Sequence, residues 1–222
     1  SYALLGALMF PEFKRAEALQ ISLWARFADE LSRQVAPDGS TIELVPGYEN
    51  CCIHWVTLSL RFARHNRCPV PPLVYRILER MYLFELTLMR PDRRCPTLGD
   101  SDSDDVFGWH REARELFPRN RRIQALLADR RTAALRETSV AFPYAGYYVM
   151  RSGWDAEALY LLLDAGRYGQ GHHHEDKLHI ELMALGRPFL VDAGRFTYDY
   201  STPARQWAVT SQAHNTILVD GA

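Results

Sequence analysis

The chain has 222 residues, 47% of them hydrophobic and 24% charged, with a formal net charge of −1. This is the composition of an ordinary globular protein that can bury a sizeable core. The near-neutral charge gives no general bias toward nucleic acid, and no apolar run reaches the roughly 18 residues that a membrane span requires.

Arginine supplies nearly all of the positive charge. Of the 26 basic residues, only Lys14 and Lys177 are lysines. Arginine pairs with carboxylates and sulfates through two parallel hydrogen bonds, which would suit an anionic ligand. A GC-rich coding sequence explains the same bias without any ligand, and composition alone favours that simpler explanation.

The first 135 residues or so have a helical pattern. In residues 13–35 the apolar side chains recur at three- and four-residue steps, which is the period of an amphipathic helix. The Ala-Pro-Asp-Gly turn at 36–39 ends that helix. Sequential helices joined by such turns predict an α-helical array. We expect its further helices over 54–66, 74–90, 106–117 and 121–136.

From Thr138 onward the period changes to two, which is typical of half-buried strands. We expect strands over 147–151, 158–164, 172–185, 188–192 and 215–220. Short strands at hairpin spacing predict an antiparallel sheet or sandwich. We therefore divide the chain into a helical domain at 1–137 and a β domain at 138–222.

A strand over 172–182 would separate its side chains onto two faces. One face would begin with three polar groups and then become apolar: His172, His174, Asp176, Leu178, Ile180 and Leu182. The other face, which we expect to be in solvent, would carry His173, Glu175, Lys177, His179 and Glu181. The three polar groups on the first face need partners, because burying them unpaired costs free energy.

Two later segments can supply those partners. Asp192 ends the next predicted strand, and His214 begins the one after it. His174, Asp192 and His214 can converge, and two imidazoles with a carboxylate suit Zn²⁺. Asp176 or a water would complete or orient the shell. A hydrogen-bonded histidine–aspartate network without metal explains the same spacing, so the pattern leaves both interpretations open.

Three tyrosines and an acidic run are further candidates. Tyr198 and Tyr200 follow the Asp192 strand, and Tyr48 lies in a predicted loop. A tyrosine can act as a general acid or base if neighbouring cations lower its pKa from about 10, although aromatic packing is its commoner role. The acidic residues at 100–105 can bind Ca²⁺ or cap a helix. We expect a cap, since the glycine and distal glutamate of an EF-hand loop are missing.

Taken in order, five segments of the chain resemble the heparinase II/III-like polysaccharide lyases, a group that includes alginate lyases. They are QVAPDGS at 34–40, GDSD at 99–102, GHHHEDKL at 171–178, LGRPFLVDAG at 185–194 and AHNTILVDG at 213–221. Each segment is short, but the ordered set extends over nearly the whole chain.

This resemblance implies an α+β fold. An incomplete (α/α) toroid, with residues 1–137 as its C-terminal part, would precede an antiparallel β-sandwich, with residues 138–222 as its N-terminal part. The chain would then be a fragment that spans the end of one domain and the start of the next. The resemblance also implies a bound Zn²⁺, mainly structural, on His174, Asp192 and His214.

The activity implied by the resemblance is β-elimination of a uronic-acid polysaccharide of the alginate or heparin/heparan-sulfate type. Tyr48 would transfer a proton, His172 would lie in the cleft near the substrate, and Tyr198 or Tyr200 would be the second tyrosine. The asparagine–histidine pair that neutralises the substrate carboxylate would lie upstream of Ser1. Because long polysaccharides are met outside the cytoplasm, we expect a periplasmic or secreted protein.

Two other classes of function stay open at this point. One is a zinc-dependent hydrolase, in which His174, Asp192 and His214 hold a metal-bound water. The other is a non-catalytic glycan-binding protein on the same fold. Only a lyase forms a product with a conjugated double bond, so ultraviolet absorbance distinguishes the three classes.

Overall fold

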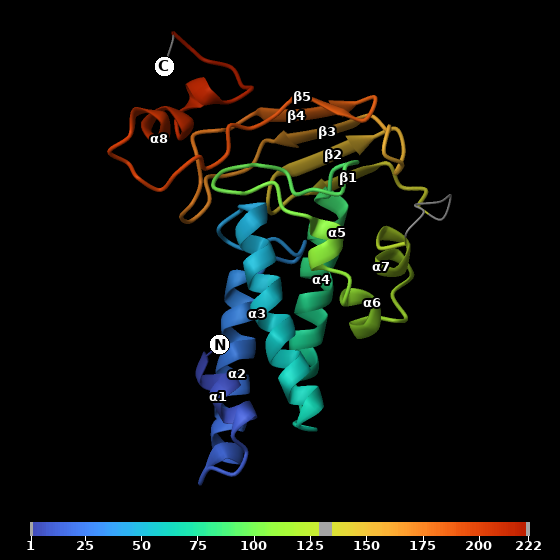
Figure 1. Cartoon of the computed structure of the whole chain (residues 1–222), viewed down its shortest axis with the longest axis vertical. Coiled ribbons are helices and arrows are strands. Elements are labelled where there is room, and N and C mark those ends of the chain that lie inside the picture. The colour runs from blue at the N-terminus through green and yellow to red at the C-terminus, as the bar shows by residue number, and fades with distance from the viewer. Residues whose placement is uncertain (1, 129–134, 221–222) are drawn as a thin grey trace.

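The computed structural model describes residues 2–128 and 135–220 of the chain. A bundle of helices comes first and a single β-sheet second, and Figure 1 shows the sheet lying across one end of the long helices. This is the α+β order that the change of period near Thr138 predicts. No described helix combines the length and apolar character needed to cross a membrane.

Four helices form the body of the bundle: α1 (Tyr2–Met9), α2 (Ala16–Gln34), α3 (Pro46–His65) and α4 (Pro72–Leu88). Their buried apolar faces form one core, in which Leu60, Leu78 and Met81 are fully buried. Three short helices follow, namely α5 (Val106–Trp109), α6 (Ala113–Leu116) and α7 (Arg121–Leu126). The side chain of Asp105 accepts a hydrogen bond from the Gly108 N–H at the start of α5, which confirms the cap expected of the acidic run.

Each predicted helix is found at its predicted position in the chain, but several begin or end at different residues. Helix α3 begins at Pro46, so Tyr48 lies in its first turn and not in a loop as predicted. Proline at the first helical position, where its missing N–H is not needed, explains this earlier start. The predicted helix 106–117 is two helices, and the predicted helix 121–136 ends at Leu126, with its positions 129–134 outside the described residues. Helix α1 was not predicted.

The sheet has five antiparallel strands in the order β1-β2-β3-β4-β5. They are β1 (Ser139–Phe142), β2 (Tyr147–Arg151), β3 (Tyr160–Asp164), β4 (His179–Ala184) and β5 (Arg187–Leu190). The inner face of the sheet packs on α4 through a second core that contains Phe84, Leu88 and Tyr147. The Tyr160 hydroxyl, buried in that core, donates to the carbonyl of Leu88 at 2.7 Å. The described residues therefore form one open sheet across the end of the bundle.

One predicted strand is absent and another is shorter than predicted. Residues 215–220 form no strand, and the segment before them contains the unpredicted helices α8 (Pro203–Ala208) and η1 (Ser211–Ala213). Strand β4 begins only at His179, so residues 172–178 form a loop, which we call the histidine loop.

The predicted assignment of faces along β4 is also wrong. His179 and Glu181 are buried, whereas Leu178 is 49% exposed. The reason lies just before the strand, where Leu178 has a left-handed backbone (φ 63°) and donates its N–H to the Asp164 carbonyl. This turn interrupts the alternation that a continuous strand would have kept, because one change of register exchanges the two faces.

Candidate active site and metal centre

The histidine loop is held against the segment that follows α4. The Asp100 N–H donates to the His172 carbonyl at 2.9 Å. Gly99 permits this contact, because it has a positive φ of 57° and a Cβ there would lie only 2.7 Å from the same carbonyl oxygen. The same segment contacts the first turn of α3, where the Gly47 N–H donates to Ser101 Oγ at 2.9 Å, so the start of the histidine loop lies beside that turn.

Three of the predicted catalytic residues lie together at this point. The His172 ring stacks on the Tyr48 ring, with 3.7 Å between the ring centroids and 16° between the planes. The Tyr48 and Tyr198 hydroxyls are hydrogen-bonded to each other, and the Tyr198 ring stands edge-on to His172 at 6.1 Å. The helical part and the β part thus each contribute rings to one cluster, and Tyr198, rather than Tyr200, is the tyrosine that contacts Tyr48.

The pKa of Tyr48 is raised above its ordinary value, so the neighbouring cations are not sufficient to lower it. Burial raises it, and the hydrogen bond to Tyr198 and the charge of Asp100 raise it further, while Arg195 lowers it slightly. Tyr48 is therefore protonated at neutral pH, which suits a proton donor better than a base.

Tyr200 lies in a different environment, because it is bonded to a buried arginine. Its hydroxyl accepts from Arg205 Nη2 at 2.9 Å, and Arg205 is only 1% exposed. The guanidinium of Arg205 also binds both carboxylate oxygens of Asp100, at 2.5 and 3.1 Å. Burial alone would raise the pKa of Asp100, but hydrogen bonds from His174, Arg205 and His172 lower it to about 2.

Sequence reasoning missed Asp100 and Arg205 as site residues. Asp100 belongs to the GDSD segment quoted for the resemblance, so a signal was present there without a role attached. Arg205 is one of the many arginines, and nothing in its neighbourhood marks it as buried.

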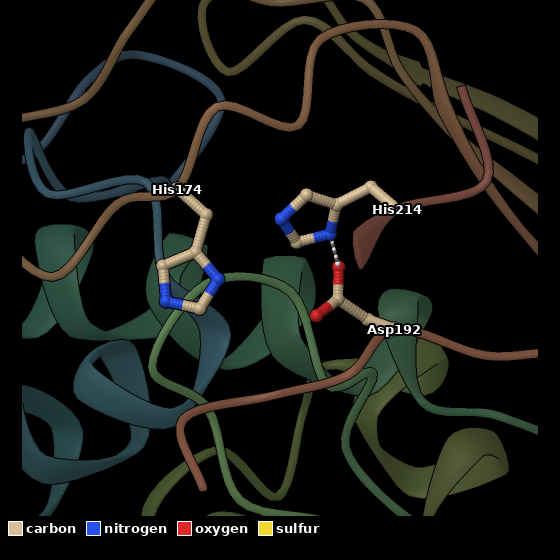
Figure 2. A group of neighbouring side chains, drawn as sticks. All are labelled: His174, Asp192 and His214. Carbon is tan, nitrogen blue, oxygen red and sulfur yellow. Dashed lines mark hydrogen bonds and ion pairs between the residues drawn. The ribbon is translucent and has the colours of Figure 1, made fainter. Parts of the chain in front are cut away.

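The three predicted metal ligands also come together. One ligand atom each from His174, Asp192 and His214 lies within 4.8 Å of the others, and all three residues are buried. Figure 2 shows the side chains turned toward one another, with His214 Nδ1 donating to Asp192 Oδ2 at 2.9 Å. We call this the His-Asp-His cluster.

The hydrogen bonds leave lone pairs directed into the His-Asp-His cluster. His174 Nδ1 and His214 Nε2 are buried and have no hydrogen-bond partner. Since His214 Nδ1 carries the proton given to Asp192, its Nε2 is a free lone pair. Two such nitrogens and one carboxylate are a donor set that fits Zn²⁺. His179, which we expected in solvent, lies beside it with Nε2 3.5 Å from Asp192 Oδ2.

A second buried group lies at the other end of the histidine loop. Asp164, His173 and Asp176 also place one ligand atom each within 4.8 Å of the others. Here Lys177 Nζ lies 2.8 Å from Asp164 Oδ2 and 3.4 Å from Asp176 Oδ1. We call this the lysine cluster. The prediction that His173 faces solvent is wrong, because the loop turns this side chain inward beside Lys177. Asp176, predicted to complete or orient the metal shell as an alternative to a water, lies in the lysine cluster.

Both parts of the chain match models of one family. Residues 2–125 match the model described as the heparinase II/III N-terminus. Residues 134–222 match the heparinase II/III-like C-terminal model.

Two curated relatives are named heparin-sulfate lyases. The one from Pedobacter heparinus is 28% identical over 98% of this chain, and the one from Bacteroides stercoris is 28% identical over 95% of it. The alignments cover only 34% and 33% of those proteins, so the chain spans about a third of their length.

The fold of the chain is similar to that of solved heparinase structures. A heparinase III gene product superposes over 99% of this chain and 36% of its own, with a TM-score of 0.90 and 27% identity. The heparan sulfate lyase HepC of Pedobacter heparinus superposes over the same shares, with a TM-score of 0.87 and 28% identity. From the family models, the relatives and the shared fold together, we conclude that the chain belongs to the heparinase II/III family.

Proposed function

We propose that the full-length protein is a polysaccharide lyase that cleaves a uronic-acid polymer by β-elimination. The observation that carries this proposal is the contact of Tyr48, His172 and Tyr198, which brings an imidazole and two phenols together. β-Elimination needs a base and an acid of this kind, and it does not need the pair of carboxylates used in glycoside hydrolysis.

In this mechanism His172 is the base and Tyr48 is the acid. His172 Nε2 takes the C5 proton of the uronate, and the electrons of that C–H bond form the C4–C5 double bond. The C4–O glycosidic bond breaks, and the leaving oxygen takes the proton of the Tyr48 hydroxyl. Because the pKa of Tyr48 is raised, its hydroxyl is protonated before the reaction. After Tyr48 has donated its proton, the hydrogen-bonded Tyr198 hydroxyl can return one to it.

The proposed cofactor is one Zn²⁺ on His174, Asp192 and His214. Bound there, it would supply a fixed positive charge that ties the histidine loop to the segments around Asp192 and His214. The support is the pair of buried, unpartnered ring nitrogens in that cluster. His172 is two residues from His174, so a rigid His-Asp-His cluster also fixes the position of the base.

For the substrate we propose a polymer of the heparin/heparan-sulfate type. The curated relatives bear that name, and the cations beside the tyrosines are arginines, which suit sulfates and carboxylates. Arg195 lies over the Tyr198 ring at 4.7 Å. Alginate, the other polymer expected from the sequence, has no sulfate and is the natural comparison.

We further propose that the described helices are part of an (α/α) toroid in the full-length protein and that the five-stranded sheet is one layer of a β-sandwich. We also propose a periplasmic or secreted location, because a long sulfated polymer is met outside the cytoplasm.

The test is the ultraviolet absorbance of the unsaturated product when the full-length protein meets heparan sulfate, heparin, alginate, hyaluronan or chondroitin. We expect a rise with heparan sulfate or heparin. A rise with alginate alone would overturn the proposed substrate and keep the reaction. New reducing ends without absorbance would indicate a hydrolase, and binding without either would indicate a glycan-binding protein.

A matched pair of variants links the reaction to the site. Tyr48→Phe removes the acid and should lower turnover by about 10²–10⁴-fold, the usual contribution of a positioned proton donor. Tyr144→Phe changes an exposed tyrosine in the turn between β1 and β2 and should leave turnover unchanged. Equal turnover in the two variants would remove Tyr48 from the mechanism.

A further inference from the structure

Asp100 lies between His172, the proposed base, and His174, a proposed metal ligand. Its Oδ2 is 3.2 Å from His172 Nδ1, and its Oδ1 is 2.9 Å from His174 Nε2. The residue is 4% exposed. One buried carboxylate is therefore bonded both to the proposed base and to a proposed metal ligand.

Those two contacts fix which ring nitrogen of each histidine carries the proton. An ionised carboxylate only accepts hydrogen bonds, so the nitrogen facing it must be the N–H. His172 is then protonated on Nδ1, and its Nε2 is the lone pair that is free to accept a proton. The opposite tautomer would set a lone pair against the carboxylate of Asp100.

The same reasoning applies to His174, with the nitrogens exchanged. Its Nε2 lies 2.9 Å from Asp100 Oδ1 and 3.2 Å from Arg205 Nη1. Because Arg205 already donates to Asp100 and the carboxylate is the nearer group, we assign the proton to Nε2, which leaves Nδ1 as the lone pair. That Nδ1 is buried and unpartnered, and it belongs to the His-Asp-His cluster. The opposite tautomer would bury an unpaired N–H there, which costs about 1–3 kcal/mol.

Arg205 holds Asp100 in this position. Its two terminal nitrogens bind the two carboxylate oxygens, a bidentate pairing that fixes both distance and plane. Arg205 is itself held by the Arg195 carbonyl at 3.1 Å and by Tyr200. The carboxylate therefore has little freedom to rotate away from either histidine.

We propose that Asp100 is a positioning residue that sets the tautomers of both histidines, giving His172 a free Nε2 for proton transfer and His174 a free Nδ1 for the metal. The task of His172 rests on the proposed lyase function. The two tautomers and the metal affinity do not, so they can be tested even if no polymer is cleaved.

The first test is a solid-state ¹⁵N spectrum of the full-length protein with labelled histidines, prepared without metal. The spectra of His172→Ala and His174→Ala assign the two rings. We expect His172 as the Nδ1–H tautomer and His174 as the Nε2–H tautomer. Either ring in the opposite tautomer would overturn the proposal, and this measurement needs no variant of Asp100.

The second test compares Asp100→Asn with Glu175→Gln. Asparagine keeps the shape but offers one acceptor oxygen, so at most one histidine keeps its tautomer, and the dissociation constant for Zn²⁺ should rise about 10–100-fold. Glu175→Gln removes an exposed carboxylate from the same loop and should leave zinc affinity unchanged. Unchanged tautomers and unchanged zinc affinity in Asp100→Asn would overturn the proposal.

If polymer cleavage is established, the same variant has a kinetic signature. Because Asp100 is buried and would act only through His172 and His174, Asp100→Asn should lower kcat with little change in KM. Arg205→Lys keeps a positive charge but loses the bidentate pairing, and a smaller fall in kcat is expected from it. A rise in KM with unchanged kcat would contradict a positioning role.

Discussion

The two buried clusters of the histidine loop use the same residue types in different ways. In the lysine cluster, the chain itself supplies a cation, because the ammonium of Lys177 lies 2.8 Å from Asp164 and 3.4 Å from Asp176. In the His-Asp-His cluster, the ion-pair partners of Asp192 within the described part of the chain are two histidines, His179 and His214. The first cluster contains its own cation, although the Asp176 oxygens have no hydrogen-bond partner among the described residues, whereas the second contains no lysine or arginine and leaves two ring nitrogens, His174 Nδ1 and His214 Nε2, unpartnered.

This difference shows that two buried histidine–aspartate groups of similar composition can differ in whether the chain supplies a cation to them. Both clusters bring three possible ligand atoms within 4.8 Å. An ammonium among the carboxylates provides part of the charge that a metal would provide and occupies the space between them, so we expect Zn²⁺ to prefer the cluster without one.

The largest effect is expected from removing a ligand of the His-Asp-His cluster. Zinc at about a thousand times its dissociation constant adds about 4 kcal/mol to the free energy of unfolding. His214→Ala should lose that gain and release the metal, as measured by metal analysis and urea unfolding with and without zinc. Full zinc content and unchanged stability would exclude His214 as a ligand.

The second prediction concerns the built-in cation of the lysine cluster. Lys177→Met should lower the free energy of unfolding by about 3 kcal/mol, at the low end for a broken buried pair because Lys177 is partly exposed. Zinc content should stay at that of the wild type, since Lys177 contacts no ligand of the other cluster. Loss of zinc in this variant would show that the two clusters are not independent.

Glu49, a buried carboxylate outside both clusters, shows what burial does to the pKa of an acid that has no cation partner in residues 2–128 and 135–220. Glu49 is 1% exposed, and burial raises its pKa to about 8, although hydrogen bonds from Thr41 lower it. Because the folded pKa is above the ordinary 4.5, the folded state holds the proton more tightly. The stability that Glu49 contributes is then present below pH 4.5 and is lost as the pH rises through about 8.

Glu49→Gln tests this sign, because glutamine is a neutral mimic of the protonated acid. Relative to the wild type, the variant should gain about 3 kcal/mol between pH 5 and pH 8 in urea unfolding. An advantage of the same size at both pH values would show that Glu49 does not titrate in this range.

The smallest effect is expected from converting one cluster into the other. Lys177→Ala leaves Asp164, His173 and Asp176 without their ammonium, so divalent cations should bind there weakly. Manganese at about ten times its dissociation constant would restore about 1.4 kcal/mol of the lost stability. No stabilisation of this variant at any manganese concentration that the wild type tolerates would show that the geometry suits only an ammonium.

The sequence was sufficient to predict helices followed by a sheet, and to predict that His174, Asp192 and His214 come together. Helical and strand periods are local properties of the sequence. His174 precedes β4, Asp192 follows β5 and His214 follows η1, so their positions relative to these elements can be read from the sequence. The turn at Leu178 could not be predicted, because it depends on the Asp164 carbonyl and the lysine cluster, which are long-range contacts. For the same reason the buried faces of His173, His179 and Glu181 were assigned wrongly.

The candidate catalytic residues were found by resemblance, and their contacts came from the fold. Nothing in the sequence distinguishes Tyr198 from Tyr200, since the two are separated by a single residue in an irregular segment. The choice follows from Tyr48 and Arg205, which approach from 150 residues upstream and from α8 respectively. Distant pairs of this kind are the part of a site that local patterns do not encode.

The most direct test of the difference between the two clusters is anomalous X-ray diffraction at the zinc edge from crystals of the full-length protein. We predict one strong anomalous peak between His174, Asp192 and His214 and none beside Lys177. A peak beside Lys177 would show that the lysine cluster binds zinc despite its ammonium. No peak between His174, Asp192 and His214 in zinc-supplemented crystals would show that these residues do not form a zinc site.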